Sequence, residues 1–149
     1  MTPERMKEIH RLLIDALNRH SSEGIAAFFH DNYTVHEGYN NVDGMERTYT
    51  VSLAMLRKSI RKGIPGLPDK HQTIKMQVAE NNLVFTYCIA TATHSGTWFG
   101  IPATGKTLTY ENLYISRFED GKIAEHWVFL DAFGMLRQIG ALSITTPSK

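Results

Sequence analysis

The spacing of apolar residues changes partway along the chain, and this change limits the folds that the chain can form. Up to about residue 61, apolar residues recur every three to four positions, which is the period of an amphipathic helix. From residue 73 onward, apolar and polar residues alternate, and Val, Ile, Phe, Tyr and Thr are frequent, as in β-strands. Helices followed by a run of strands predict an α+β domain, in which the helices pack on one face of a strongly curved, mostly antiparallel sheet.

Local signals set the bounds of the predicted elements. Helices are predicted over residues 3–19, over a short segment from Ile25, and over 49–61. Strands are predicted over 33–37, 73–79, 83–98, 107–118 and 123–131. The last two strands meet at Asp120-Gly121, a dipeptide that is typical of two-residue hairpin turns. The space between the helices and the concave side of the sheet is a natural small-molecule pocket.

Length and charge exclude several classes of protein. A chain of 149 residues suffices for one domain, so we expect a single domain over 1–149. Its 16 Lys and Arg against 15 Asp and Glu lack the basic excess of nucleic-acid-binding domains. The single cysteine, Cys88, fits a reducing compartment, and we expect a cytoplasmic protein. No apolar run approaches the ~20 residues that span a bilayer, and the charged N-terminus does not resemble a signal peptide. We therefore expect neither nucleic acid nor a membrane as a partner.

Residues 100–107 match the phosphate-binding pattern GxxxxGK[ST]. That motif requires a helix beginning at the lysine, because the free N–H groups of the first helical turn hold the phosphates. The residues after Lys106 alternate instead and favour a strand. We therefore predict a loop that connects two strands, and no nucleotide site.

Asp131 is the first candidate for a catalytic residue. It ends an otherwise hydrophobic strand, where burial would raise the pKa of a carboxyl group toward the range that suits proton transfer. The alternative is that Asp131 caps the next turn, with a side-chain oxygen on a backbone N–H. If Asp131 is the general acid or base, replacing it with asparagine should lower turnover by ~10²–10⁴-fold.

The register of the last hairpin determines which side chains share a face with Asp131. A plain two-residue turn gives that face the aromatic and polar character of a small-molecule pocket, with Tyr110, Asn112, Tyr114, Ser116, Trp127 and Phe129. A three-residue turn with a glycine bulge would shift the pairing by one and bring Glu111 to that face. We prefer the first register because it separates this surface from an aliphatic one, which consists of Leu113, Ile115, Val128 and Leu130.

Further candidates lie elsewhere in the chain. His36-Glu37 ends the early strand and could supply a second proton-transfer group, the alternative being an exposed strand end. His94 either points into the cavity or forms a hydrogen bond within a turn. Met45 and Met55 are expected to line the interior. The other histidines and Cys88 do not show the spacing of metal ligands, so no metal site is expected.

Several runs of the sequence resemble the SnoaL-like polyketide cyclases of the nuclear-transport-factor-2-like superfamily. They are residues 94–96, 100–106, 118–127, Asp131 and 134–138. The resemblance implies a cone-shaped α+β fold with a deep hydrophobic pocket, a homodimer, and catalysis without cofactor or metal, typically the intramolecular aldol cyclisation of a polyketide ester. It also implies that Asp131 is the general acid or base. Glu37 falls where ketosteroid isomerases carry a carboxylate base, whereas many SnoaL-like members have a histidine near this point, and here His36 precedes it by one residue.

The sequence thus predicts a cofactor-independent acid–base enzyme, a cyclase or isomerase of a hydrophobic, carbonyl-bearing, polyketide-like small molecule. The expected catalytic residues are Asp131, Glu37 and His94. The expected substrate-binding residues are His36, Tyr110, Asn112, Tyr114, Trp127, Phe129 and Met55. The alternatives are an epoxide or ester hydrolase in the same pocket, or a small-molecule binding protein without catalytic activity.

Overall fold

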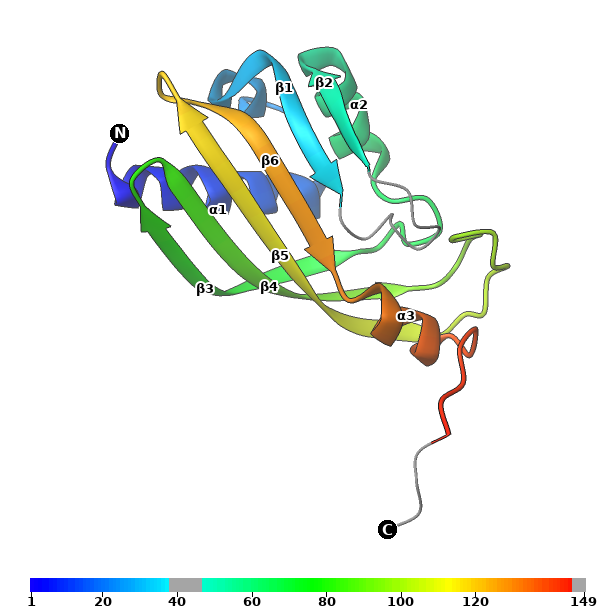
Figure 1. The fold of residues 1–149 in the computed structure, drawn as a ribbon. Coiled ribbons are helices and arrows are strands. Elements are labelled where there is room, and N and C mark those ends of the chain that lie inside the picture. Colours follow the sequence, from blue (N-terminus) through cyan, green and yellow to red (C-terminus); the bar gives the residue numbers. More distant parts are fainter. Residues whose placement is uncertain (38–46, 146–149) are drawn as a thin grey trace.

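The computed structural model describes residues 1–37 and 47–145, which form helices packed on a curved six-stranded sheet (Figure 1). In chain order the elements are α1 (Pro3–Arg19), the 3-10 helix η1 (Ile25–Phe28), β1 (Phe29–Glu37), β2 (Thr48–Ser52), α2 (Leu53–Lys62), β3 (His71–Glu80), β4 (Leu83–Thr93), β5 (Thr107–Glu119), β6 (Lys122–Leu130) and α3 (Ala132–Gln138). The predicted α+β class, with helices on one face of a curved sheet, is confirmed.

The strands lie in the order β2-β1-β6-β5-β4-β3. All neighbouring pairs are antiparallel except β1 and β6, which run parallel. The connection from β2 through α2 to β3 allows the early strand β1 to lie beside the last strand β6, far from it in the sequence. Residues near the end of β1 are therefore neighbours of the C-terminal hairpin (Figure 1).

The helix α1 forms over the residues predicted for it. The Thr2 hydroxyl caps its start by accepting a hydrogen bond from the Arg5 backbone N–H at 3.2 Å, and Pro3 occupies the first turn, where its missing N–H has no cost. Met6, Ile9 and Leu13 form the buried stripe, and the helix packs against β3 and β4. This packing covers part of the concave face of the sheet.

The helix predicted over 49–61 is wrong in its first turn, because residues 48–52 form β2 and the helix α2 begins at Leu53. Tyr49, Thr50 and Val51 favour a strand and pair with β1. The Ser52 hydroxyl then accepts a hydrogen bond from the Met55 backbone N–H and so marks the start of the helix.

The preferred register of the last hairpin is wrong by one residue. The turn at Asp120-Gly121 has two residues, as predicted, and both have positive φ, 48° and 78°. The shift arises inside β6, where Ala124 is left without a partner between the pairs Phe118–Ile123 and Arg117–Glu125. The pairing beyond this bulge is the alternative that the sequence allowed, although a bulge within the strand, and not a longer turn, produces it.

The bulge exchanges the two faces of β6. Tyr114 now lies opposite Val128, and Ile115 lies opposite Trp127. His126 and Val128 consequently face the concave side of the sheet, whereas Trp127 and Phe129 face the outer side.

The connection before β5 agrees with a further prediction. Residues 100–106 form a loop before β5, as predicted, so the lysine of the GxxxxGK[ST] pattern does not begin a helix. Among the described residues, none of the helices combines the length and apolar character needed to cross a bilayer.

Candidate functional site

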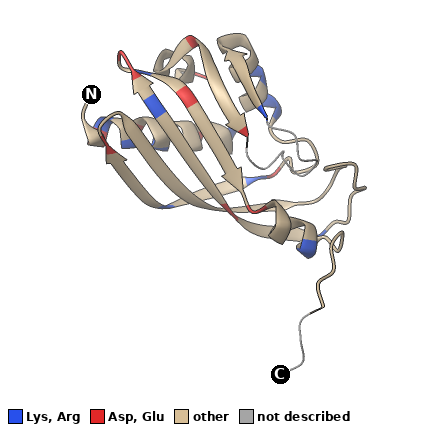
Figure 2. Cartoon of the chain, in the orientation of Figure 1, with Lys and Arg blue, Asp and Glu red and all other residues tan. Residues whose placement is uncertain are grey.

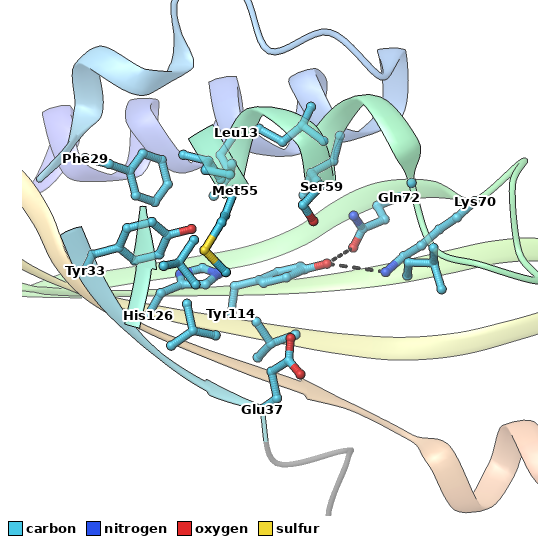
Figure 3. Close-up of a pocket in the computed structure, with 18 of the residues that line it drawn as sticks. Leu13, Phe29, Tyr33, Glu37, Met55, Ser59, Lys70, Gln72, Tyr114 and His126 are labelled. Carbon is cyan, nitrogen blue, oxygen red and sulfur yellow. Dashed lines mark hydrogen bonds between the residues drawn. The ribbon is translucent and has the colours of Figure 1, made fainter. Parts of the chain in front are cut away.

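A cavity of about 270 Å³ lies between α1, α2 and the concave face of β1, β5 and β6. This volume is slightly below the range of about 300–1,000 Å³ that is usual for small-molecule pockets. Its wall is mostly apolar and includes Phe29, Tyr33, Val51, Met55, Leu56 and Ile60. The predicted pocket between helices and sheet is therefore present, and Met55 lies on its wall as expected. Figure 3 shows the polar side chains that enter it.

Strand alternation decides between His36 and Glu37. Tyr33, Val35 and Glu37 are two residues apart on β1 and all line the cavity. Glu37 is partly buried, and one of its carboxylate oxygens accepts a hydrogen bond from the Tyr49 hydroxyl on β2 at 2.5 Å. His36 points to the outer face, where its ring stacks on Trp127 with 4.8 Å between ring centroids. The carboxylate of this pair belongs to the pocket, and the imidazole does not.

The second polar feature of the pocket is built around the Tyr114 hydroxyl. This hydroxyl donates to Gln72 Oε1 at 2.7 Å and accepts from Asn112 Nδ2 at 2.9 Å and from Lys70 Nζ at 3.4 Å. The Lys70 ammonium also lies 5.6 Å from the centroid of the Tyr110 ring. The hydrogen bonds fix the Tyr114 side chain and place a cationic nitrogen beside it (Figure 3).

Burial lowers the pKa of Lys70 to about 8, because the charged ammonium loses water that the pocket does not replace. The nearby Cys88 acts weakly in the opposite direction. A lysine with this pKa is still mostly charged at neutral pH. Lys70 can therefore offer a positive charge to an oxygen in the cavity.

His126 is the third polar group of the pocket. Its ring stacks on Tyr114, with 5.7 Å between centroids and 19° between planes, and its Nδ1 lies 2.8 Å from Ser116 Oγ. Burial lowers the pKa of His126 to about 4, so the imidazole is neutral at pH 7. Sequence reasoning missed His126 because the unshifted register turned it to the outer face.

Lys70 was also missed, and the local sequence gives little signal for it. It lies between the proline- and glycine-rich turn after α2 and the start of β3, a position that is usually exposed. Its burial results from contacts with Tyr110 and Tyr114, which are distant in sequence.

The prediction of a buried Asp131 in the pocket is wrong. The side chain is exposed and caps α3, with Oδ1 accepting a hydrogen bond from the Gly134 backbone N–H at 2.9 Å. This is the capping alternative that the sequence left open. A side chain at Gly134 would collide with the Asp131 carboxylate, which explains the glycine at this place.

We expect Asp131→Ala to lower the free energy of unfolding by ~1 kcal/mol, because the N-terminal N–H groups of α3 lose their cap. Asp131→Asn keeps a capping oxygen and should retain most of that stability. Urea unfolding of the two variants and the wild type measures the difference. Neither variant is expected to change turnover on a substrate of the pocket. A large loss of turnover in Asp131→Asn with unchanged stability would show that Asp131 has a catalytic role in addition to capping α3.

The remaining candidates among the described residues do not line the cavity. His94 is buried in the loop after β4, where its Nδ1 accepts a hydrogen bond from the Thr104 backbone N–H and lies 2.9 Å from the Thr104 hydroxyl. Tyr110 and Asn112 lie behind Lys70 and Tyr114, which they contact. Trp127 and Phe129 are on the outer face, as described above. Met45 lies outside the described residues.

The described residues contain no group of three or more His, Cys, Asp or Glu side chains placed to hold a metal ion. The side chains of the described pocket offer a carboxylate, a lysine ammonium and a neutral imidazole around an apolar space. These groups can accept a proton, donate hydrogen bonds and stabilise a negative charge.

A curved sheet and N-terminal helices that enclose a small-molecule pocket define the nuclear-transport-factor-2-like class of α+β proteins. The sequence profile of the SnoaL-like polyketide cyclases matches residues 7–139. The chain belongs to this family.

Relatives of known sequence match over a short segment. Aklanonic acid methyl ester cyclase DnrD of Streptomyces peucetius is 40% identical over 47 residues, which are 32% of this chain and 32% of that protein. DauD of Streptomyces sp. strain C5 is 40% identical over the same number of residues, 32% of this chain and 29% of DauD. The matching segment thus spans about a third of the length of these curated relatives.

Solved structures match over nearly the whole chain. AclR, a candidate hydroxylase of Streptomyces galilaeus, is 26% identical with a TM-score of 0.74, covering 96% of this chain and 89% of AclR. IdmH, a candidate polyketide cyclase of Streptomyces antibioticus, is 26% identical with a TM-score of 0.73, covering 90% of this chain and 97% of IdmH. TsrD of Streptomyces laurentii, at 23% identity and a TM-score of 0.75, covers 95% of this chain and 99% of TsrD and supports the fold alone.

Proposed function

We propose that this protein is a cyclase or isomerase that acts on a hydrophobic, carbonyl-bearing, polyketide-like small molecule by acid–base catalysis without a cofactor. One observation carries the proposal. A single, mostly apolar cavity is lined by Glu37, Lys70 and His126. A base facing hydrogen-bond donors across an apolar space is the arrangement that proton removal beside a carbonyl group requires.

The proposed reaction begins when Glu37 takes a proton from a carbon atom adjacent to a substrate carbonyl. The C–H electron pair then forms an enolate, and the negative charge on its oxygen is stabilised by Lys70 and His126. In a cyclisation, the enolate carbon attacks a second carbonyl carbon of the same molecule and forms the new C–C bond. The resulting alkoxide receives the proton that Glu37 holds. In an isomerisation, the proton returns to a different carbon atom instead.

A ring closure also requires that the substrate be held in a folded conformation, and the apolar wall of the cavity can provide this. A flexible chain loses conformational freedom when two of its carbonyl groups are brought into contact, and a shaped cavity supplies this ordering through binding. The names of the aklanonic acid methyl ester cyclases and of IdmH agree with a polyketide-like substrate.

Incubation with aklanonic acid methyl ester, followed by mass spectrometry and NMR of the product, tests the proposal. A ring-closed product of unchanged mass, formed without incorporation of labelled oxygen from solvent water, is expected. A parallel incubation of ketone-bearing polyketides in deuterated water detects proton exchange beside a carbonyl even where no ring forms. Incorporation of solvent oxygen would support a hydrolase instead, and binding with neither exchange nor product would support a non-catalytic binding protein.

We further propose that the protein forms a homodimer through the outer face of the sheet. Two rows of mostly apolar side chains cross β3 to β6 on this face, Val78-Phe85-Ile115-Trp127 and Met76-Tyr87-Leu113-Phe129. Met76, Val78, Phe85 and Phe129 are exposed. Figure 2 shows few charged residues along strands β4, β5 and β6. A broad apolar surface of this kind is typical of an interface between protein chains.

Phe129→Glu is expected to convert the dimer to a monomer, because the change places a charge on an exposed position of this apolar surface. Light scattering coupled to size-exclusion chromatography measures the mass of both forms. Phe133→Glu is the matched control, since Phe133 is also exposed but lies on α3, away from the outer face. A monomeric wild type, or a Phe129→Glu variant that remains dimeric, would contradict the proposed interface.

A further inference from the structure

A line of hydrogen bonds connects the pocket with the far side of α1. His126 Nδ1 lies 2.8 Å from Ser116 Oγ, which lies 2.7 Å from His10 Nε2. His10 Nδ1 lies 2.7 Å from Thr86 Oγ1, which lies 3.0 Å from Gln77 Nε2. Ser116, His10 and Thr86 are at most 1% exposed, so water does not interrupt the line between them. Its members come from α1, β3, β4, β5 and β6 and share no sequence motif.

The outer end of this line has a fixed orientation. Gln77 Oε1 accepts a hydrogen bond from the Arg11 guanidinium at 2.9 Å, and a guanidinium can only donate. Gln77 Nε2 lies 3.1 Å from the Lys7 backbone carbonyl oxygen, which can only accept. The two contacts agree on which atom of the Gln77 amide is oxygen and which is nitrogen. Thr86 Oγ1 is therefore the acceptor in its bond with Gln77.

The direction of this first hydrogen bond determines the direction of each hydrogen bond that follows. Thr86 has one hydroxyl hydrogen, and it is left to donate to His10 Nδ1. His10 then carries its hydrogen on Nε2 and donates to Ser116 Oγ, and Ser116 donates to His126 Nδ1. Both imidazoles are neutral at pH 7, because burial lowers the pKa of His10 to about 3 and that of His126 to about 4. His126 must then carry its single N–H hydrogen on Nε2.

The reverse orientation has an energetic cost. It would leave the hydroxyl hydrogen of Thr86 or of Ser116 without an acceptor, since the contacts above are the hydrogen bonds that these two side chains form among the described residues. An unsatisfied buried donor is unfavourable, because it has lost its hydrogen bonds to water without replacing them. This cost favours one tautomer of His126 over the other by about 5- to 150-fold.

We infer that Gln77, Thr86, His10 and Ser116 are positioning residues that fix His126 as a hydrogen-bond donor, with its Nε2–H directed to the pocket. His126 Nε2–H then donates a hydrogen bond to a ligand oxygen, such as that of a ketone or an enolate, and discriminates against a hydroxyl or amine that would need to donate at this point. The identity of the ligand oxygen rests on the proposed function. The tautomer does not, because it is a property of the protein without substrate.

Nitrogen NMR of the labelled, substrate-free protein at neutral pH tests this inference, because the two ring nitrogens of a neutral histidine have different chemical shifts when they carry hydrogen. The His126 signals are assigned by comparison with His126→Gln. The wild type is expected to show the Nε2–H tautomer. Gln77→Glu should produce the Nδ1–H tautomer, because a carboxylate cannot donate to Thr86. The Thr86 hydroxyl would then donate to the introduced carboxylate, and each following hydrogen bond would reverse.

Gln138→Glu is the matched control, since Gln138 is an exposed glutamine whose side chain bonds to the Thr109 backbone, outside this line. It should leave the His126 tautomer unchanged. An Nδ1–H tautomer in the wild type would overturn the inference, whatever the variants do. A folded Gln77→Glu protein that keeps the Nε2–H tautomer would overturn it as well. Failure to find any substrate that the protein cyclises would contradict the proposed function but would not overturn this inference. The two proposals can therefore fail separately.

Discussion

Replacing Glu37 with glutamine is expected to lower turnover by ~10²–10⁴-fold, the usual contribution of a general base. Glutamine has almost the same shape as glutamate and can still accept a hydrogen bond from the Tyr49 hydroxyl, so the end of β1 should keep its structure. It cannot take a proton from carbon. The loss should therefore appear in kcat, with KM changed far less, and also in the rate of hydrogen–deuterium exchange beside the substrate carbonyl.

Glu125→Gln provides the control for this experiment. Glu125 is also a partly buried glutamate on the sheet, but it lies on the outer face, where it pairs with Arg117 and His36. These partners lower the pKa of its carboxyl group, Arg117 most strongly. The same chemical change at Glu125 removes an ion pair and should leave turnover within a few-fold of the wild type. Full activity of Glu37→Gln on a converted substrate would show that another group takes the proton.

The parts of the fold that could be predicted are those determined by neighbours in the sequence. The bounds of α1 follow from Pro3, its cap at Thr2 and the stripe of Met6, Ile9 and Leu13. The Asp120-Gly121 turn follows from the preference of these residues for positive φ. The preference of β2 for a strand was also present locally, in Tyr49-Thr50-Val51, but helical spacing obscured it.

The polar groups of the pocket could not be predicted, because their placement depends on contacts that the sequence does not show. One bulged residue, Ala124, turns His126 inward and Trp127 outward, and nothing in its side chain distinguishes it from a paired strand residue. Asp131 illustrates a different difficulty. A carboxylate at the end of a hydrophobic strand has the same sequence pattern whether it enters a pocket or caps the helix that follows.

His10 shows what the sequence could have indicated. It stands beside Ile9 in the buried stripe of α1, where an imidazole needs hydrogen-bond partners. The pattern thus indicated a buried polar contact, but its partners Thr86 and Ser116 are 76 and 106 residues away. Only the three-dimensional arrangement connects this histidine with His126.

The two buried histidines should make the protein sensitive to mild acid. Each has a pKa near 6.5 in the unfolded chain, and burial lowers it to about 3 for His10 and about 4 for His126. At pH values between the unfolded and the folded pKa, the unfolded chain binds more protons than the folded protein. The free energy of unfolding therefore falls as pH decreases below about 6.5. At about pH 5 each of the two histidines should lower the free energy of unfolding by roughly 2 kcal/mol relative to neutral pH, or by roughly 4 kcal/mol together. That is a large part of the 5–15 kcal/mol that is typical of folded domains.

Urea unfolding at neutral pH and at about pH 5 measures this loss. His126→Gln should reduce the loss by about half, because one of the two titrating groups is gone. His71→Gln is the control, since His71 is exposed at the start of β3 and its replacement should leave the pH dependence unchanged. Carboxyl groups with lowered pKa, such as Asp69, act in the same direction but at lower pH. A free energy of unfolding that stays constant down to about pH 5 would mean that His10 and His126 can accept protons without leaving their buried positions.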